Sequence, residues 1–291
     1  MQLIDGKSLS KKVQDAVKSD IEILKTEQGM VPGLAVVIVG DDPASHAYVG
    51  MKEKACKNVG LYSIAHKMPN TITQDEIIAI ITMMNKNPHI HGILVQLPLP
   101  KHIDTTKILE VIDPKKDVDG FHAYNVGRMV VNLDSFVACT PLGVMKMFEE
   151  YNIELEGKDV VVVGASNIVG KPMSSLLLNA NATVTTTHIY TKDLKRHTLN
   201  ADIVIVGVGV PNLIKEDMVK EGAIVIDIGI NRLDDGRLVG DVDFDAVSPK
   251  CSYITPVPGG VGPMTIAMLL KNTLISAQAF AKEKQQVNEG N

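Results

Sequence analysis

The sequence is poor in several features that would point to particular partners. It has no tryptophan, and aromatic residues make up only 4% of its 291 residues, which argues against a surface that stacks nucleic-acid bases. Its formal net charge is −5 and it has no basic run, which disfavours nucleic acid and anionic membranes. No apolar run is long enough to span a bilayer, and Met1–Lys7 lacks the apolar core of a signal peptide. We therefore expect neither a nucleic-acid nor a membrane partner.

Cysteines and metal-binding motifs are also scarce. Cys56, Cys139 and Cys251 lie far apart and outside any CxxC pattern, which predicts buried, reduced thiols in a cytoplasmic protein. His89 and His91 flank the entrance of a predicted strand, but no further Cys or His lies at ligand spacing, so no metal site is expected. A GxSxG nucleophile elbow and a Walker A loop are absent too.

What the sequence does contain is an alternation of short apolar runs and helical patterns, which predicts an α/β fold with parallel sheets. The length suggests two domains. In the first half, strands are predicted at 34–40 and 90–97, and helices at 9–27, 45–59 and 74–85, the last with a Thr73–Glu76 capping box. In the second half, strands are predicted at 160–164, 182–187, 203–207 and 223–229, with helices near 171–180, 192–200 and 214–221.

The second half therefore has the pattern of a Rossmann-like, doubly wound parallel-sheet domain, and the first half that of a separate α/β substrate domain. A helix predicted at 141–151 joins them, and a last helix from 264 to about 284 is expected to return to the first domain. The expected division is 1–139 with the C-terminal helix 264–291 as one domain, and 140–263 as the other.

The most specific segment is the loop 255–265, Thr-Pro-Val-Pro-Gly-Gly-Val-Gly-Pro-Met-Thr. Its prolines fix φ and its glycines allow backbone angles that side chains forbid, so the loop encodes a particular shape. A stretch that is apolar at helical spacing follows it, and the N–H groups at the start of that helix suit a ligand. A plain connection between two elements is the alternative.

A second loop, Gly164–Gly170, follows a strand and opens a helix, which is the context of a dinucleotide-binding fingerprint. Gly164 permits a tight turn, and Gly170 lets the helix approach the sheet. Ser166 and Asn167 occupy the middle of the motif, so its spacing departs from GxGxxG and a purely structural turn is the alternative.

The end of the next strand indicates which dinucleotide binds. NAD enzymes usually place Asp or Glu there to bind the ribose 2′-hydroxyl. This chain has His-Ile-Tyr-Thr-Lys at 188–192, without an acid, and Lys171 or Lys192 can offer a positive charge. The sequence therefore favours NADP, although Ile189 gives a 2′-phosphate no bond of its own.

Polar residues in the first half are candidates for the chemistry. Tyr48 and Lys52 share one face of a helix, either as a stacking and proton-transfer pair or, as spacing alone favours, as a surface pair. Gln96 ends an apolar strand, where ligands collect in open α/β sheets. Asp119 lies in the charge-mixed turn 115–120, and such turns usually lie in solvent.

Taken together, these segments resemble the bifunctional methylenetetrahydrofolate dehydrogenase/cyclohydrolase family. The resemblance extends along nearly the whole chain, and it is the combination of motifs that makes it specific. The motifs lie at 43–45, 48–52, 92–100, 116–122, 140–143, 164–170, 227–231, 240–243 and 255–265.

The resemblance implies two consecutive reactions. 5,10-Methylenetetrahydrofolate gives a hydride to NADP⁺, and water opens the resulting 5,10-methenyl cation to 10-formyltetrahydrofolate. It also implies a folate cleft between the domains and a homodimer. A lysine can serve as base in the second step only if its pKa falls from about 10.4, through burial or a nearby positive charge.

The resemblance also implies roles for individual residues. For the folate, Tyr48 stacks on the aminobenzoate ring, Lys52 serves the cyclohydrolase step, Gln96 tunes that lysine, Asp119 holds the pterin, and Pro256, Gly259 and Gly260 line the folate side. For the cofactor, Gly164, Ala165 and Ser166 take the phosphates, Ile230 contacts the nicotinamide, and Ile189 occupies a position that often carries Arg or Ser for the 2′-phosphate.

Two other interpretations remain at this point. One is a dehydrogenase that has lost hydrolysis, against which the presence of Lys52, Gln96 and Asp119 argues. The other is a non-catalytic dinucleotide-binding module, which would not need those residues.

Overall fold

The computed structural model describes residues 1–289 and forms two compact units, each assembled from separate stretches of the chain. Unit 1 comprises Met1–Lys11, Arg128–Asp134 and Ala138–Thr265. Unit 2 comprises Lys12–Gly127, Ser135–Val137 and the chain from Ile266 on. The functional division at 139/140 and 263/264 stays a prediction.

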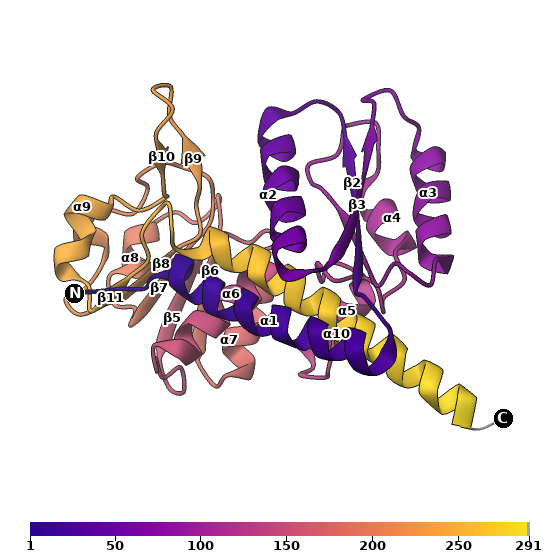
Figure 1. Ribbon diagram of the computed structural model, residues 1–291. Helices are drawn as coiled ribbons and strands as arrows, with labels where there is room; N and C mark the ends of the chain where they lie inside the picture. The colour runs from indigo at the N-terminus through magenta and orange to yellow at the C-terminus, as the bar shows by residue number, and fades with distance from the viewer. Residues whose placement is uncertain (290–291) are drawn as a thin grey trace. The chain divides into compact units, whose positions relative to one another are not determined.

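Unit 1 contains a six-stranded sheet in which every pairing is parallel (Figure 1). In spatial order its strands are β1 (Gln2–Leu3), β11 (Tyr253–Ile254), β8 (Ile224–Asp227), β7 (Ile203–Val206), β5 (Asp159–Val163) and β6 (Thr183–Thr187). The four strands expected in the second half are present. The last two strands at one end of the sheet, β1 and β11, have only two residues each, which is too short for a periodic signal in the sequence.

Unit 1 contains several further elements. They are α6 (Cys139–Glu150), α7 (Gly170–Asn179), α8 (Leu194–Thr198), α9 (Phe244–Val247), the 3₁₀ turns Glu216–Met218 and Ser248–Lys250, and the antiparallel pair β9 (Asn231–Arg232) and β10 (Leu238–Val239). The core is made largely of valines and isoleucines from β5, β7 and β8, which are buried on both faces as expected for a parallel sheet.

The helix expected near 214–221 is wrong. Only the 3₁₀ turn Glu216–Met218 forms there. Ile214 pairs with Val242 in an isolated bridge, and Val219 has extended backbone angles. Both side chains are fully buried in the core of unit 1, so tertiary burial overrides the helical pattern.

Unit 2 contains a three-stranded parallel sheet in the order β3 (Tyr62–Met68), β2 (Gly33–Val39), β4 (Gly92–Val95). The sheet lies between α2 (Pro43–Val59) on one side and α3 (Gln74–Lys86) on the other (Figure 1). Strand β3 was not expected. It is an edge strand whose residues are exposed or half-buried, so it lacks the continuous apolar run that marks the other two.

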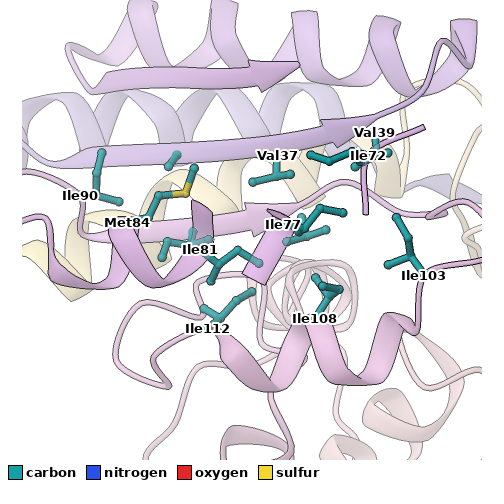
Figure 2. Packing of buried hydrophobic residues seen from close by; sticks show 13 residues of the cluster. Val37, Val39, Ile72, Ile77, Ile81, Met84, Ile90, Ile103, Ile108 and Ile112 are labelled. Atoms are coloured by element: carbon teal, nitrogen blue, oxygen red, sulfur yellow. The ribbon is translucent and has the colours of Figure 1, made fainter. Parts of the chain in front are cut away.

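Helices α3 and α4 (Thr105–Val111) pack on this sheet through isoleucines (Figure 2). Ile77, Ile81 and Ile108 are fully buried in one hydrophobic cluster with Val37 of β2. The predicted capping box fixes the start of α3, because Thr73 N donates to Glu76 Oε2 (2.8 Å) and Glu76 N donates to Thr73 Oγ1 (3.3 Å).

The remaining helices are α1 (Gly6–Gln28), α5 (Ala123–Val130) and α10 (Val261–Glu289), so the last helix begins three residues earlier than expected. All three cysteines are buried and free, as predicted. Burial raises the pKa of the Cys56 thiol to about 12 and that of Cys251 to about 11, which keeps both in the unreactive thiol form.

Candidate functional site

Helix α2 carries the Tyr48–Lys52 pair and has a well-defined start. Asp42 caps it by accepting a hydrogen bond from Ser45 N (2.8 Å), and Pro43 occupies the first turn. Tyr48 is half-buried, and burial raises the pKa of its hydroxyl. Lys52, one turn later, is only 8% exposed. The interpretation of this pair as a surface pair is therefore wrong for Lys52.

Gln96 is the partner of the Lys52 ammonium. It follows β4, and its backbone N donates to Val37 O (2.8 Å), which extends the sheet ladder by one residue. Lys52 Nζ donates to Gln96 Oε1 (3.0 Å), while Gln96 Nε2 donates to Leu97 O (2.8 Å). Because the second bond uses the amide N–H, the carbonyl end must face the lysine. The structure thus joins two of the predicted catalytic residues directly.

Asp119 lies on a turn that is much less exposed than a charge-mixed turn was expected to be. Asp119 itself is half-buried, and its neighbours Lys116 and Asp117 are 2% and 1% exposed. Lys116 Nζ donates to three carbonyl oxygens at the end of α3, those of Met84, Asn85 and Asn87. The expectation of a solvent-exposed turn is therefore wrong, because this lysine caps a helix C-terminus.

Asp117 shapes the turn that carries Asp119. Its carboxylate accepts hydrogen bonds from Phe121 N (3.2 Å), His122 N (2.9 Å) and Asn125 Nδ2 (2.9 Å). Burial raises the pKa of Asp117 to about 6 in spite of these bonds, which favour the charged form. The first aspartate of the motif thus holds the backbone of this turn in place.

In unit 1, the loop between β5 and α7 has the geometry of a phosphate site. Gly164 has φ of +118°, and a Cβ there would lie 2.7 Å from Gly207 O. A Cβ on Gly170 would overlap Gly164 O. Helix α7 starts without a side-chain cap of its own, while Ser166 Oγ accepts from Val169 N (3.1 Å).

Ala165 and Ser166 lie on this loop, the first half-buried and the second exposed. Ser166 Oγ also accepts from Gly170 N (3.4 Å), the first residue of α7. An exposed turn before a helix N-terminus suits an anion, because the helix dipole and the first backbone N–H groups favour negative charge. The loop therefore fits the pyrophosphate of a dinucleotide.

The segment after β6 is exposed. Ile189 is 92% and Tyr190 85% exposed. Tyr190 N donates to His188 Nδ1 (3.2 Å), which closes a turn with no carboxylate in it. Lys192 is exposed in the same segment, and Lys171, on α7, donates to Asn167 Oδ1 (2.7 Å).

The loop 255–260 is held firmly within unit 1. Thr255 is fully buried, and its Oγ1 accepts from Asp227 N (2.7 Å). Pro256 and Gly259 are half-buried, and Gly259 O accepts from Lys7 N (2.9 Å). Gly260 is buried, and a Cβ there would lie 2.5 Å from Pro256 O. The predicted shaped loop is thus present, with Gly259 at φ of +106°.

Ile230 lies on the loop that follows β8 and is 42% exposed. Within residues 1–289, no group of three or more His, Cys, Asp or Glu side chains is placed to hold a metal ion. No helix in that range is both long and apolar enough to cross a membrane.

Comparisons with known proteins match the candidate residues of unit 2 and those of unit 1 to two domains of one family. Residues 4–119 match the family model of the tetrahydrofolate dehydrogenase/cyclohydrolase catalytic domain, and residues 138–281 match that of the NAD(P)-binding domain of the same family. The chain belongs to the tetrahydrofolate dehydrogenase/cyclohydrolase family.

Relatives in this family match along almost their whole length. The bifunctional protein FolD of Sulfurovum sp. is 80% identical, over 97% of this chain and 100% of its own length. The FolD crystal structure from Campylobacter jejuni is 56% identical with a TM-score of 0.95, covering 96% of this chain and 99% of that one. The FolD of Trypanosoma brucei, solved with NADP and an inhibitor, is 38% identical with a TM-score of 0.92, over 95% and 97% of the two chains.

The family's catalytic-domain match contains Tyr48, Lys52, Gln96 and Asp119, and its NAD(P)-binding match contains the remaining candidate residues. Sequence reasoning assigned no role to three buried acids: Asp117, Asp227 and Asp241. Each lies within three residues of a glycine in one of the motifs described above. Buried polar groups are almost always hydrogen-bonded, but their burial is not visible in the sequence.

Proposed function

We propose that this chain oxidises 5,10-methylenetetrahydrofolate with NADP⁺ and then hydrolyses the product to 10-formyltetrahydrofolate. In the first step the methylene carbon loses a hydride to the cofactor. In the second, water adds to the methenyl carbon, a ring C–N bond opens and one proton is released. The observation that carries the proposal is the buried Lys52 bonded to an oriented Gln96 in a chain of this family.

The hydrolytic step rests on Lys52. Its ammonium is removed from water, and Gln96 Oε1 holds it at 3.0 Å. Lys52, or a water that it orients, takes the proton of the attacking water. Tyr48, one helical turn away and half-buried, offers a ring face for the aminobenzoate.

Two further segments are proposed to hold the folate. Asp119 suits the amino and ring N–H donors of a pterin, because a carboxylate accepts two bonds in one plane. Asp117 supports it by binding the backbone of the same turn. Pro256, Gly259 and Gly260 are proposed to line the folate side, since their loop keeps a fixed shape.

The cofactor is proposed to bind on unit 1. Gly164, Ala165 and Ser166 hold the pyrophosphate at the start of α7, and Ile230 contacts the nicotinamide. When bound, NADP⁺ supplies the hydride acceptor, while the protein supplies alignment.

The preference for NADP over NAD is part of the proposal. The turn after β6 contains no carboxylate to repel a 2′-phosphate, and Lys192 is exposed beside it. Ile189 contributes no hydrogen bond. Comparing kcat/KM for NADP⁺ and NAD⁺ tests this, and a preference for NAD⁺ would contradict it.

We also propose a cytoplasmic homodimer in which residues 1–139 with the C-terminal helix bind folate and residues 140–263 bind NADP. The buried free thiols suit a reducing compartment. The dimer rests on the family resemblance, and light scattering of the purified protein tests it; a monomer at working concentration would contradict it.

The experiment that tests the function uses purified protein with methylenetetrahydrofolate and NADP⁺, following reduced cofactor and formyl product together. Both products are expected. Reduced cofactor without formyl product would indicate a dehydrogenase alone, and nucleotide binding without turnover would indicate a non-catalytic module.

A further inference from the structure

Two carboxylates in unit 1 are buried, yet the proposed chemistry does not use them. Asp227 ends β8 and is 4% exposed, and Asp241, two residues after β10, is 0% exposed. Acids are rarely buried so completely unless they are paired or hydrogen-bonded. The partners of these two acids show what they hold.

Asp227 binds three backbone N–H groups. Its Oδ1 accepts from Gly229 N (2.9 Å) and Asp241 N (3.0 Å), and its Oδ2 accepts from Val242 N (2.9 Å). It therefore ties the first residues after β8 to the segment that contains the second acid.

Asp241 reaches two different loops. Its Oδ2 accepts from Val208 N (2.6 Å) and Gly209 N (3.0 Å), which follow β7, and its Oδ1 accepts from Asn231 Nδ2 (2.8 Å), which follows β8. The two acids thus connect three segments of backbone through six hydrogen bonds. We call Asp227 and Asp241 the carboxylate clamp.

Glycines let the backbone close on this clamp. A Cβ on Gly229 would overlap the Asp241 carboxylate, and a Cβ on Gly240 would overlap Asp227 Oδ2. These contacts explain why the motifs 227–231 and 240–243 each combine an aspartate with a glycine. Any side chain at either glycine would displace a carboxylate.

The loops held by the clamp lie where the nicotinamide half of a dinucleotide is expected. The pyrophosphate belongs after β5 and the adenosine ribose after β6. Strands β7 and β8 lie on the other side of β5 in the sheet. Ligands of open parallel sheets bind at the carboxyl ends of the strands, so the other half of the dinucleotide extends over the loops after β7 and β8.

Two apolar side chains on these loops are exposed, Val208 (37%) and Ile230 (42%). Val208 is bound to the clamp through its own N–H, and Ile230 through both neighbours, Gly229 and Asn231. We propose that Asp227 and Asp241 are positioning residues that set Val208 and Ile230 for the nicotinamide half. This inference rests on the proposed function.

The test uses the full-length protein without folate, and two probes: NADP⁺ and 2′,5′-ADP, which lacks the nicotinamide half. Asp241→Asn removes the negative charge that the N–H groups of Val208, Gly209 and Asn231 share, and replaces one acceptor oxygen by an N–H₂ group. It is expected to weaken NADP⁺ binding at least fivefold and to leave 2′,5′-ADP binding within twofold. Adding Asn231→Asp restores a donor–acceptor pair and is expected to recover NADP⁺ affinity.

Asn231→Ala is the second variant, for use if Asp241→Asn fails to fold. Asn231 is half-buried and contributes one bond to the clamp, so NADP⁺ affinity should fall and 2′,5′-ADP affinity should not. Asp243→Asn is the matched control. It changes a half-buried acid in the same segment, which pairs with Lys215 (3.0 Å).

Unchanged NADP⁺ affinity in Asp241→Asn, or an equal loss for both probes, would overturn the positioning role. An equal loss would mean that the clamp merely stabilises the unit. A parental protein that binds neither probe would contradict the proposed function itself, and the clamp's role would fall with it.

Discussion

The two candidate sites use different parts of the polypeptide. In unit 2 the candidate groups are side chains, with the Lys52 ammonium and the Gln96 amide joined directly. In unit 1 they are mostly backbone, because glycine turns and N–H groups form the proposed phosphate loop, and buried acids bind backbone N–H groups. The difference matches the chemistry: proton transfer needs a titratable group, whereas a dinucleotide needs a shaped surface.

The largest expected effect comes from Lys52. Lys52→Ala should lower hydrolysis of the methenyl substrate at least ~100-fold, the size usually lost with a general base. NADP⁺ binding should not change, because the cofactor loop lies in unit 1. The assay is methenyl hydrolysis, with nucleotide titration alongside.

Lys54→Ala is the control for this variant. Lys54 lies on the same helix but is exposed. If Lys52→Ala hydrolyses the methenyl substrate at the parental rate, the catalytic role of the lysine is wrong.

The converse test is Gly170→Ala, which changes one atom on the nucleotide side. The added Cβ overlaps Gly164 O, so we expect NADP⁺ affinity to fall roughly tenfold or more, while methenyl hydrolysis stays within about twofold. Gly127→Ala is the control, since a Cβ there meets nothing within 4 Å. Equal losses of NADP⁺ affinity and of methenyl hydrolysis would show that the two sites cannot be altered independently.

Asp119→Ala should act on both reactions. We expect the KM for folate to rise roughly 10- to 150-fold in each, because the loss of a charged hydrogen bond to a ligand costs about 1.5–3 kcal/mol. Asp75→Ala, an exposed acid in the first turn of α3, is the control. An unchanged KM in both assays would exclude Asp119 from substrate binding.

The smallest expected effect is a change in the free energy of unfolding with pH. Burial raises the folded-state pKa of Asp117 and of Asp227 from 3.8 to about 6. Because the folded protein then binds the proton more tightly than the unfolded chain does, protonation of each group stabilises the fold. This contribution to the free energy of unfolding is complete below pH 3.8 and is lost as the pH rises through 6. From pH 4 to 7 each group thus contributes a loss of at most about 3 kcal/mol in the free energy of unfolding.

Denaturant titrations at several pH values measure this loss. In Asp117→Asn the pH-dependent contribution of that residue should disappear, so the free energy of unfolding should change less between pH 4 and 7 than in the parent. An unchanged slope would show that Asp117 has an ordinary pKa in the folded protein.

The sequence allowed the repeating architecture to be predicted, because continuous apolar runs such as 160–164 and 203–207 mark buried parallel strands. It could not reveal β3, which is an edge strand without such a run, or the extended backbone at Ile214 and Val219, which long-range burial imposes. Elements of two residues, such as β1 and β11, exist only because a neighbouring strand pairs with them.

The candidate site could be predicted where its residues lie within a recognisable motif, as Lys52 and Gln96 do. Spacing alone favoured a surface position for Lys52, because it reveals neither the burial of this residue nor its hydrogen bond to Gln96, which is distant in sequence. The acids that hold backbone were missed for the same reason: the hydrogen bonds that Asp241 accepts from Val208 N and Gly209 N span more than thirty positions.

The central claim is that one chain performs both steps. Its most direct test is the product balance of the purified parental protein, given methylenetetrahydrofolate and NADP⁺. The account predicts that each molecule of reduced cofactor is accompanied by one of 10-formyltetrahydrofolate. Methenyl product that accumulates and opens no faster than in buffer alone, or the absence of reduced cofactor, would contradict it.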